Sequence, residues 1–86
     1  MKTSISQLSV LLGRTRMQTQ RALNEMNRCG LVNIVKSRNG LAIEPTEKVR
    51  EILSSDFQAL YKESLHILLP YRGDALLILG QVALSL

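Results

Sequence analysis

The chain opens with apolar residues at helical spacing. A stripe of positions three and four residues apart, typical of an amphipathic helix of about two turns, is made by Ile5, Leu8, Leu11 and Leu12. Ser4 and Gln7 have capping-box spacing at its start, and Gly13 suits the left-handed conformation that ends many helices. We therefore predict a helix between Ser4 and Gly13, with Ser6, Gln7 and Ser9 outside its buried face.

A second capping-box pattern, Thr15 with Gln18, begins only two residues after Gly13. Two helices joined by so short a turn cross steeply, which is the geometry of a helix-turn-helix. At 100° per residue, the positions expected to pack on the first helix are Thr19, Ala22, Leu23 and Met26. The opposite side carries Met17, Arg21, Asn24 and Arg28, flanked by Arg16, Gln18 and Gln20.

Period-two alternation replaces the helical spacing after Gly30. The run 32–36 alternates as a strand, 37–40 contains the Asn-Gly pair typical of a hairpin turn, and 41–43 alternates again. These three segments predict a β-hairpin. The fold class is therefore mainly α with a small β-hairpin.

The second half of the chain is predicted to form two more helices. Thr46 is expected to cap a helix that runs to about Leu69 and is stopped by Pro70. After a turn at 71–73, Asp74 is expected to cap a last helix, 75–84, which is apolar around nearly its whole circumference.

A single chain of 86 residues has little core in which to bury such a helix. We therefore interpret the two C-terminal helices as a homodimerisation layer, with an interface made by Phe57, Leu60, Tyr61, Leu68, Leu76, Leu79 and Val82. The alternative is that they form only the core of one chain.

The net charge of +4 is unevenly distributed, because residues 1–43 hold seven Lys or Arg against the single acid Glu25, a net +6. Such segregation favours an N-terminal half that faces a polyanion. The simpler alternative is a solvated basic surface. No linker or repeat divides the chain, so we expect one compact unit.

Residues 4–53 resemble the winged helix-turn-helix of MarR-like transcription regulators. The resemblance rests on Leu8, Leu12-Gly13, the turn Arg14-Thr15, Leu23, Met26 and Gly30-Leu31-Val32, then on the hairpin as the wing and on 45–53 as the start of the following helix. It implies a helix-turn-helix and wing in 1–45 and a helical dimerisation region in 46–86. The chain begins almost at the second helix of the usual winged-helix order, so the C-terminal helices are expected to cover the surface that the first helix would cover.

This reading predicts a sequence-specific regulator that binds double-stranded DNA as a homodimer, with a recognition helix at about Arg16–Cys29 in the major groove. Arg pairs bidentately with guanine and Asn or Gln with adenine, whereas a helix rich in acid would be repelled by phosphates. The predicted DNA-binding residues are Arg14, Thr15, Arg16, Met17, Gln18, Gln20, Arg21, Asn24, Arg28, Lys36, Arg38 and Asn39. A winged-helix protein–protein assembly module is the alternative, and a small-molecule effector is left open.

Other chemistry is less favoured. His66 and Cys29 stand alone, so we interpret them as an interface histidine and a buried thiol rather than a metal ligand and a redox sensor. Met17 is either a contact to a thymine methyl or a simple exposed methionine. Catalytic constellations, metal spacings and cofactor loops are not recognised, so we predict no enzyme, metal or cofactor. The lone cysteine, the lack of a signal sequence and the short C-terminal apolar run predict a cytoplasmic protein with no membrane partner.

Overall fold

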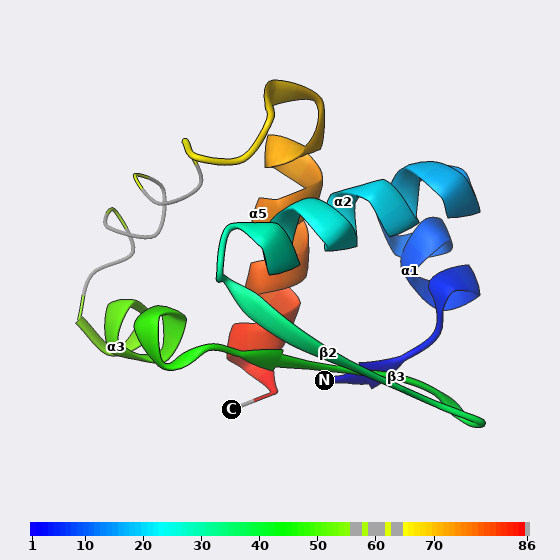
Figure 1. The fold of residues 1–86 in the computed structure, drawn as a ribbon, viewed down its shortest axis with the longest axis horizontal. Coiled ribbons are helices and arrows are strands. Elements are labelled where there is room, and N and C mark those ends of the chain that lie inside the picture. The colour runs from blue at the N-terminus through cyan, green and yellow to red at the C-terminus, as the bar shows by residue number, and fades with distance from the viewer. Residues whose placement is uncertain (56–57, 59–61, 63–64, 86) are drawn as a thin grey trace.

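The computed structural model describes residues 1–55, 58, 62 and 65–85 (Figure 1). Its elements in chain order are β1 (Lys2–Thr3), α1 (Ile5–Leu12), α2 (Arg16–Arg28), β2 (Val32–Ser37), β3 (Gly40–Pro45), α3 (Glu47–Ser55) and α5 (Leu69–Leu84). The fold is mixed α/β and mainly helical, with a small antiparallel sheet in the strand order β1-β3-β2. The predicted hairpin is confirmed, and the third strand, β1, was not predicted.

Helix α1 begins and ends where the sequence predicts. Ser4 Oγ accepts a hydrogen bond from the Gln7 amide at 3.1 Å, and Gly13 ends the helix in the left-handed conformation at φ 65°. The second half of the predicted capping box is replaced, because Gln7 Oε1 accepts from Thr3 Oγ1 at 3.3 Å. Gln7 thus ties α1 to the strand before it.

The buried face of α1 differs from the prediction at two positions. Ser9, expected outside, is buried; its hydroxyl donates to Ile5 O at 2.7 Å, and its oxygen lies within hydrogen-bond distance of Thr19 Oγ1, at 3.2 Å. Leu11, expected in the apolar stripe, is 47% exposed, while Leu8 is buried. The small hydroxyl can take the interior position because both of these polar contacts are made inside the protein.

Helix α2 is fixed by a complete capping box. Thr15 Oγ1 accepts from the Gln18 amide at 3.1 Å, and Gln18 Oε1 accepts from the Thr15 amide at 3.1 Å. The four positions predicted to face inward are all buried: Thr19, Ala22, Leu23 and Met26. The helix-turn-helix arrangement of α1 and α2 therefore follows the local sequence signals.

The sheet depends on Gly40. β2 and β3 pair through a two-residue loop, with Ser37 opposite Gly40, and β1 pairs on the other side of β3, with Lys2 opposite Ala42. Gly40 has φ 125°, and a Cβ at this position would overlap the carbonyl oxygen of Thr3. Only glycine therefore allows both the hairpin turn and the close approach of β1.

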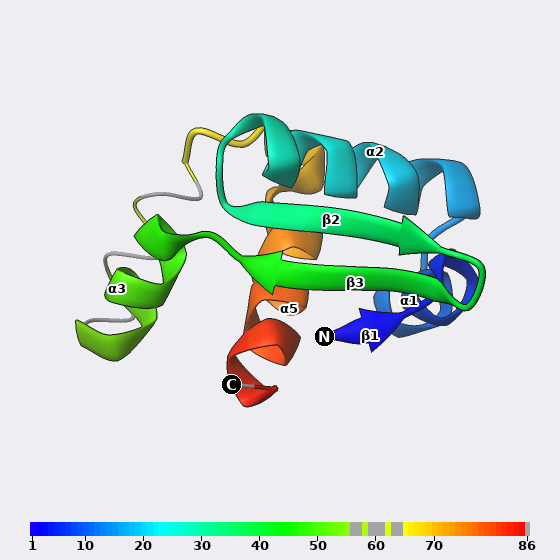
Figure 2. The ribbon, with the colours of Figure 1, turned by 60° about the horizontal axis from the view of Figure 1, so that its bottom comes forward.

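Helix α5 crosses α2 steeply and packs against β3 behind the sheet (Figures 1 and 2). Its residues Ala75, Ile78, Leu79 and Val82 join the same buried cluster as Leu8, Leu23 and Met26. Each large apolar side chain buried in this way contributes about 1.5–3 kcal/mol. α5 thus closes the core of the single chain, as the covering role predicted for the C-terminal helices requires.

Burial within one chain corrects part of the predicted dimer interface. Leu79 and Val82 lie in the core and offer no surface to a partner, whereas Leu76 is half-buried and Leu68 is exposed. The remaining predicted interface positions, Phe57, Leu60 and Tyr61, lie outside the described residues.

The start of α5 also differs from the prediction. Pro70, expected to stop a helix, lies in the first turn of α5 after the N-cap Leu68. The predicted turn 71–73 is helical, and Asp74, the predicted cap, is a buried residue within the helix. Leu65–Leu68 are not helical, so the helix from Thr46 does not reach Leu69. Proline ends a helix when it falls in the interior but is favoured in the first turn, so its position alone allowed either assignment.

Thr46 links the start of α3 to the end of α2. Its hydroxyl, predicted to cap α3, donates to Gly30 O at 2.7 Å, and its amide donates to Leu31 O at 3.2 Å. The Thr46 carbonyl accepts from the Arg50 amide at 3.0 Å, so the backbone still opens the helix.

Candidate nucleic-acid interface

The outward side of α2 is a continuous polar and basic face. Met17 is 64% exposed, and Arg21, Asn24 and Arg28 are exposed as predicted. Since the opposite side of the helix is fully buried, the packing fixes which residues point outward. These four positions, here called the α2 face, therefore have a defined orientation.

Two polar side chains on this helix are held by a mutual hydrogen bond. Gln20 Nε2 donates to Asn24 Oδ1 at 3.1 Å, one helical turn apart. This bond orients the Asn24 amide and leaves its two N–H donors for a partner. An oriented amide loses less conformational entropy on binding than a free one.

The N-terminal end of α2 is partly occupied by internal bonds. Gln18 uses its carbonyl oxygen in the capping box, while its amino group remains available. Thr15 serves as the cap itself. An Arg16 terminal amino group contacts Ser6 Oγ across the turn. The side chains of Thr15, Arg16 and Gln18 are exposed, and their internal bonds connect α1, the turn and the start of α2.

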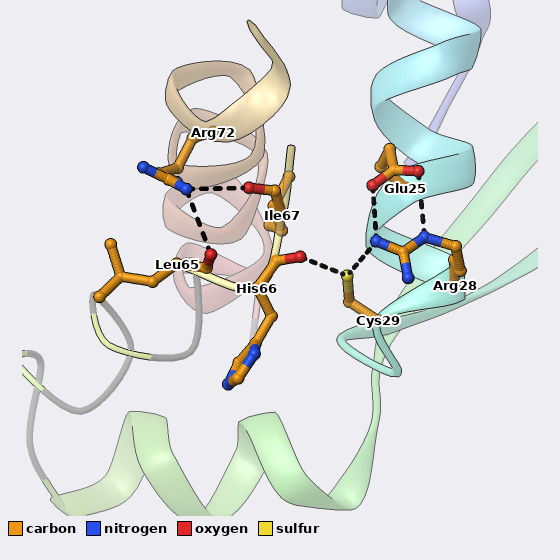
Figure 3. A network of polar contacts seen from close by, with 7 residues as sticks. All are labelled: Glu25, Arg28, Cys29, Leu65, His66, Ile67 and Arg72. Carbon is orange, nitrogen blue, oxygen red and sulfur yellow. Dashed lines mark hydrogen bonds and ion pairs between the residues drawn. The ribbon is translucent and has the colours of Figure 1, made fainter. Parts of the chain in front are cut away.

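Arg28, at the other end of α2, is engaged within the protein (Figure 3). Its Nε and a terminal amino group donate to the two carboxylate oxygens of Glu25 at 3.1 and 2.9 Å. These bonds, with a backbone hydrogen bond from Leu68, hold the pKa of Glu25 below its usual range, and the Glu25 carboxylate raises the pKa of Arg28. The pair joins the only acid on this helix to one of its cations, so Arg28 is engaged within the protein and is not a free cation.

The same network holds the segment before α5 against the end of α2 (Figure 3). The Cys29 thiol donates to His66 O at 3.5 Å, and a terminal amino group of Arg72 donates to Leu65 O and Ile67 O, each at 3.2 Å. Cys29 is half-buried rather than buried, and the His66 side chain, predicted to be a partly buried interface residue, is exposed in the single chain. The Cys29 thiol and the His66 carbonyl bond to each other. The described part of the chain has no group of three His, Cys, Asp or Glu that could hold a metal.

Arg14, in the turn before α2, pairs with a residue that was not predicted to belong to the site. Its Nε donates to Asp74 Oδ1 of α5 at 3.3 Å. The Asp74 side chain is only 7% exposed, while that of Arg14 is 47% exposed. A small pocket of about 160 Å³ adjoins the pair, lined by Arg14, Gln18, Arg21, Pro70, Tyr71 and Asp74. No local signal could predict this, since the two partners are 60 positions apart in sequence.

The hairpin supplies a second basic surface. Lys36, Arg38 and Asn39 are exposed at and beside its turn, and Lys2 of β1 joins Asn39 in lining a shallow pocket of about 160 Å³ next to it. The hairpin turn and the N-terminal end of α2 lie toward the same end of the molecule, opposite α3 (Figures 1 and 2). Lys2 was missed as a site residue because a two-residue strand has too few positions to show alternation.

Five cations near this end lack an acidic partner. Within residues 1–55, 58, 62 and 65–85, no carboxylate lies within ion-pair distance of Lys2, Arg16, Arg21, Lys36 or Arg38. Unpaired cations clustered near one end of a protein produce a positive potential that attracts polyanions. Within the predicted set, the structure therefore distinguishes free cations from the paired Arg14 and Arg28.

Comparison with protein-family models, curated proteins and solved structures finds no match to this chain. No described helix has both the length and the apolar character required to cross a bilayer.

Proposed function

We propose that the chain is a sequence-specific transcription regulator that binds double-stranded DNA as a homodimer in the cytoplasm. The observation that carries the proposal is the α2 face, where exposed Arg21 and Asn24 stand on a rigidly packed helix with no acid free to oppose them. Arginine and asparagine on an exposed helix are the side chains that read guanine and adenine edges in the major groove. No catalytic activity is part of this proposal.

The order of the elements supports a winged-helix form. A short strand, two helices joined by a tight turn and a hairpin paired with that strand follow one another along residues 1–45. In this proposal α2 is the recognition helix and the β2–β3 hairpin is the wing. α5 packs on α2 and β3 and closes the core beneath them.

The side chains have separate roles in the proposed complex. Arg21 and Asn24 contact base edges, and Met17 contacts a thymine methyl. Lys36 and Arg38 of the wing contact phosphates, which positions the protein without reading sequence. Arg28 supports Glu25 and contributes little to binding, in contrast to the role predicted from the sequence.

The homodimer is supported by exposed leucines, of which Leu68 belongs to the interface predicted from the sequence and the other three do not. Leu68, Leu69, Leu77 and Leu84, at the start and along the outer side of α5, are each at least 54% exposed. Pairing such surfaces removes apolar area from water and links two recognition helices for a site with twofold symmetry. The same leucines support the second candidate, a winged-helix module that binds another protein.

Duplex binding at varied salt tests the proposed function. The chain is titrated into a pool of random fluorescent duplexes, and the dissociation constant is measured by anisotropy at several salt concentrations. We expect the logarithm of the affinity to fall linearly with the logarithm of salt, with a slope that reports on the order of 4–8 phosphate contacts per dimer. Arg38→Ala should reduce the slope, whereas the matched control Arg50→Ala, on exposed α3, should not. Binding that is absent or independent of salt rejects the regulator and favours the protein-binding module.

A further inference from the structure

The contact between Arg14 and Asp74 is the only described ion pair that joins the helix-turn-helix to α5. Asp74 lies among buried residues of α5, with Ala75 next to it fully buried. A carboxylate in such surroundings is costly to bury unless it is paired. Since an apolar residue of similar size commonly gives equal or greater stability at such a site, stability alone does not explain the pair.

The geometry of the pair leaves most of the guanidinium unused. Asp74 accepts from Nε of Arg14 at 3.3 Å, so the two terminal amino groups of Arg14 are not needed to hold Asp74. With its side chain 47% exposed, Arg14 can present these groups to solvent. Two parallel N–H donors match the two non-bridging oxygens of a phosphodiester.

The neighbouring pocket places this guanidinium beside the proposed reading helix. Arg14 and Arg21 line it from one side, with Gln18 between them in sequence, and Tyr71 and Asp74 line it from α5. Its two cations outnumber its single carboxylate, so the pocket has a net positive charge. A phosphate held at Arg14 would therefore lie next to Arg21 and would fix the position of α2 along the groove.

We propose that Arg14 binds a DNA phosphodiester and that Asp74 is the positioning residue that holds its guanidinium ready for that contact. This inference rests on the proposed function. It also gives α5 a role in DNA binding, because the helix that completes the core supplies the group that orients a phosphate ligand.

The direction in which Asp74→Asn changes the affinity for DNA tests the proposal. Asp74→Asn removes a negative charge near the interface, which by electrostatics alone strengthens DNA binding. If Asp74 positions Arg14, the same substitution weakens binding, by about threefold to tenfold. The 86-residue chain is titrated into the random duplex pool at several salt concentrations. Glu47→Gln, at an exposed position of α3, is the matched control that removes an acid elsewhere. The control should bind as tightly as the wild type or slightly tighter.

A double-mutant cycle separates positioning from a structural effect. In the Arg14→Ala background, Asp74→Asn should cause no further loss of affinity. Arg14→Ala, alone or combined with Asp74→Asn, should reduce the slope of log affinity against log salt by about 0.9 for each lost phosphate contact. Circular dichroism melts confirm that each variant is folded at the assay temperature. If Arg14→Ala alone does not fold because it leaves a buried carboxylate unpaired, Arg14→Gln replaces it in the cycle, since its amide can donate to Asp74 without supplying a positive charge to a phosphate.

Two results overturn the positioning role while leaving the proposed function intact: Asp74→Asn binding as tightly as the wild type or tighter, and an equal loss with and without Arg14. A wild-type chain with no salt-dependent binding rejects the proposed function, and the positioning role with it.

Discussion

Replacing Leu79 by alanine tests whether α5 belongs to the core of one chain or to a contact between subunits. The Leu79 side chain is 0% exposed and lies in the central apolar cluster. Truncating a buried leucine costs about 2–5 kcal/mol, through lost transfer free energy and the cavity left behind. A domain of this length has roughly 4–13 kcal/mol of stability, so the variant should lose a large share of it.

Leu77 provides the matched control on the same helix. It is 54% exposed, so Leu77→Ala should change the free energy of unfolding by less than about 1 kcal/mol in the monomer. Urea denaturation followed by far-UV circular dichroism measures both variants. The melting temperature should fall by roughly 4–8 °C for each kcal/mol lost.

Measuring how the stability loss depends on protein concentration can refute this reasoning. If Leu79 lies within one chain, the stability lost in Leu79→Ala does not depend on concentration. Suppose instead that Leu79→Ala halves the sedimenting mass and that its stability loss disappears at high concentration. Leu79 would then lie at a subunit interface, and the packing of α5 described above would be wrong.

Three further outcomes are expected. Arg21→Ala should cost about 1–3 kcal/mol on a preferred duplex and relax base preference, whereas Arg38→Ala should weaken all sequences alike; competition with mutated sites measures both, and the reverse pattern would remove α2 as the reader. Gly40→Ala should lower the urea midpoint clearly, because its Cβ meets backbone at a positive φ, and an unchanged midpoint would contradict the tight approach of β1. Because the pKa of Glu25 is lower in the folded state than its ordinary value of 4.5, the ionised Glu25 carboxylate stabilises the fold at pH values above 4.5. This contribution is lost as the pH falls through the lower folded-state pKa. The stability gap between wild type and Glu25→Gln should therefore narrow in acid, and a gap that is constant from pH 7 downward would show that the bond to Arg28 is not responsible.

Signals that lie within a few residues were predictable from the sequence. The Thr15–Gln18 capping box and the left-handed Gly13 depend on local conformational preferences and occur as predicted. The hairpin also forms within 37–40, with Arg38 and Asn39 as its loop and Gly40 as the first residue of β3. The inward and outward sides of α2 also followed, because a helix of this length has a clear periodicity.

Features that depend on distant residues were not predictable. Ser9 can be buried because its hydroxyl bonds to Ile5 O and lies next to the Thr19 hydroxyl of α2, and a helical wheel of α1 does not contain that second partner. Asp74 had the spacing of a cap but lies inside α5, since Pro70 was equally able to begin a helix as to end one. Its partner, Arg14, comes from the other end of the chain. The base-contact and dimer assignments remain predictions.

The crossing of α2 by α5 has a consequence for the order of folding. The segment between these helices contains the whole hairpin and α3. Packing α5 against α2 therefore closes a long loop, and we expect the chain to lose this loop-closure entropy late in folding. The helix-turn-helix and the hairpin are held by near neighbours in sequence and can form quickly. We therefore expect the rate-limiting step to include the capture of α5. During synthesis, the helix-turn-helix and the hairpin would therefore form before α5 packs against them and covers their apolar side.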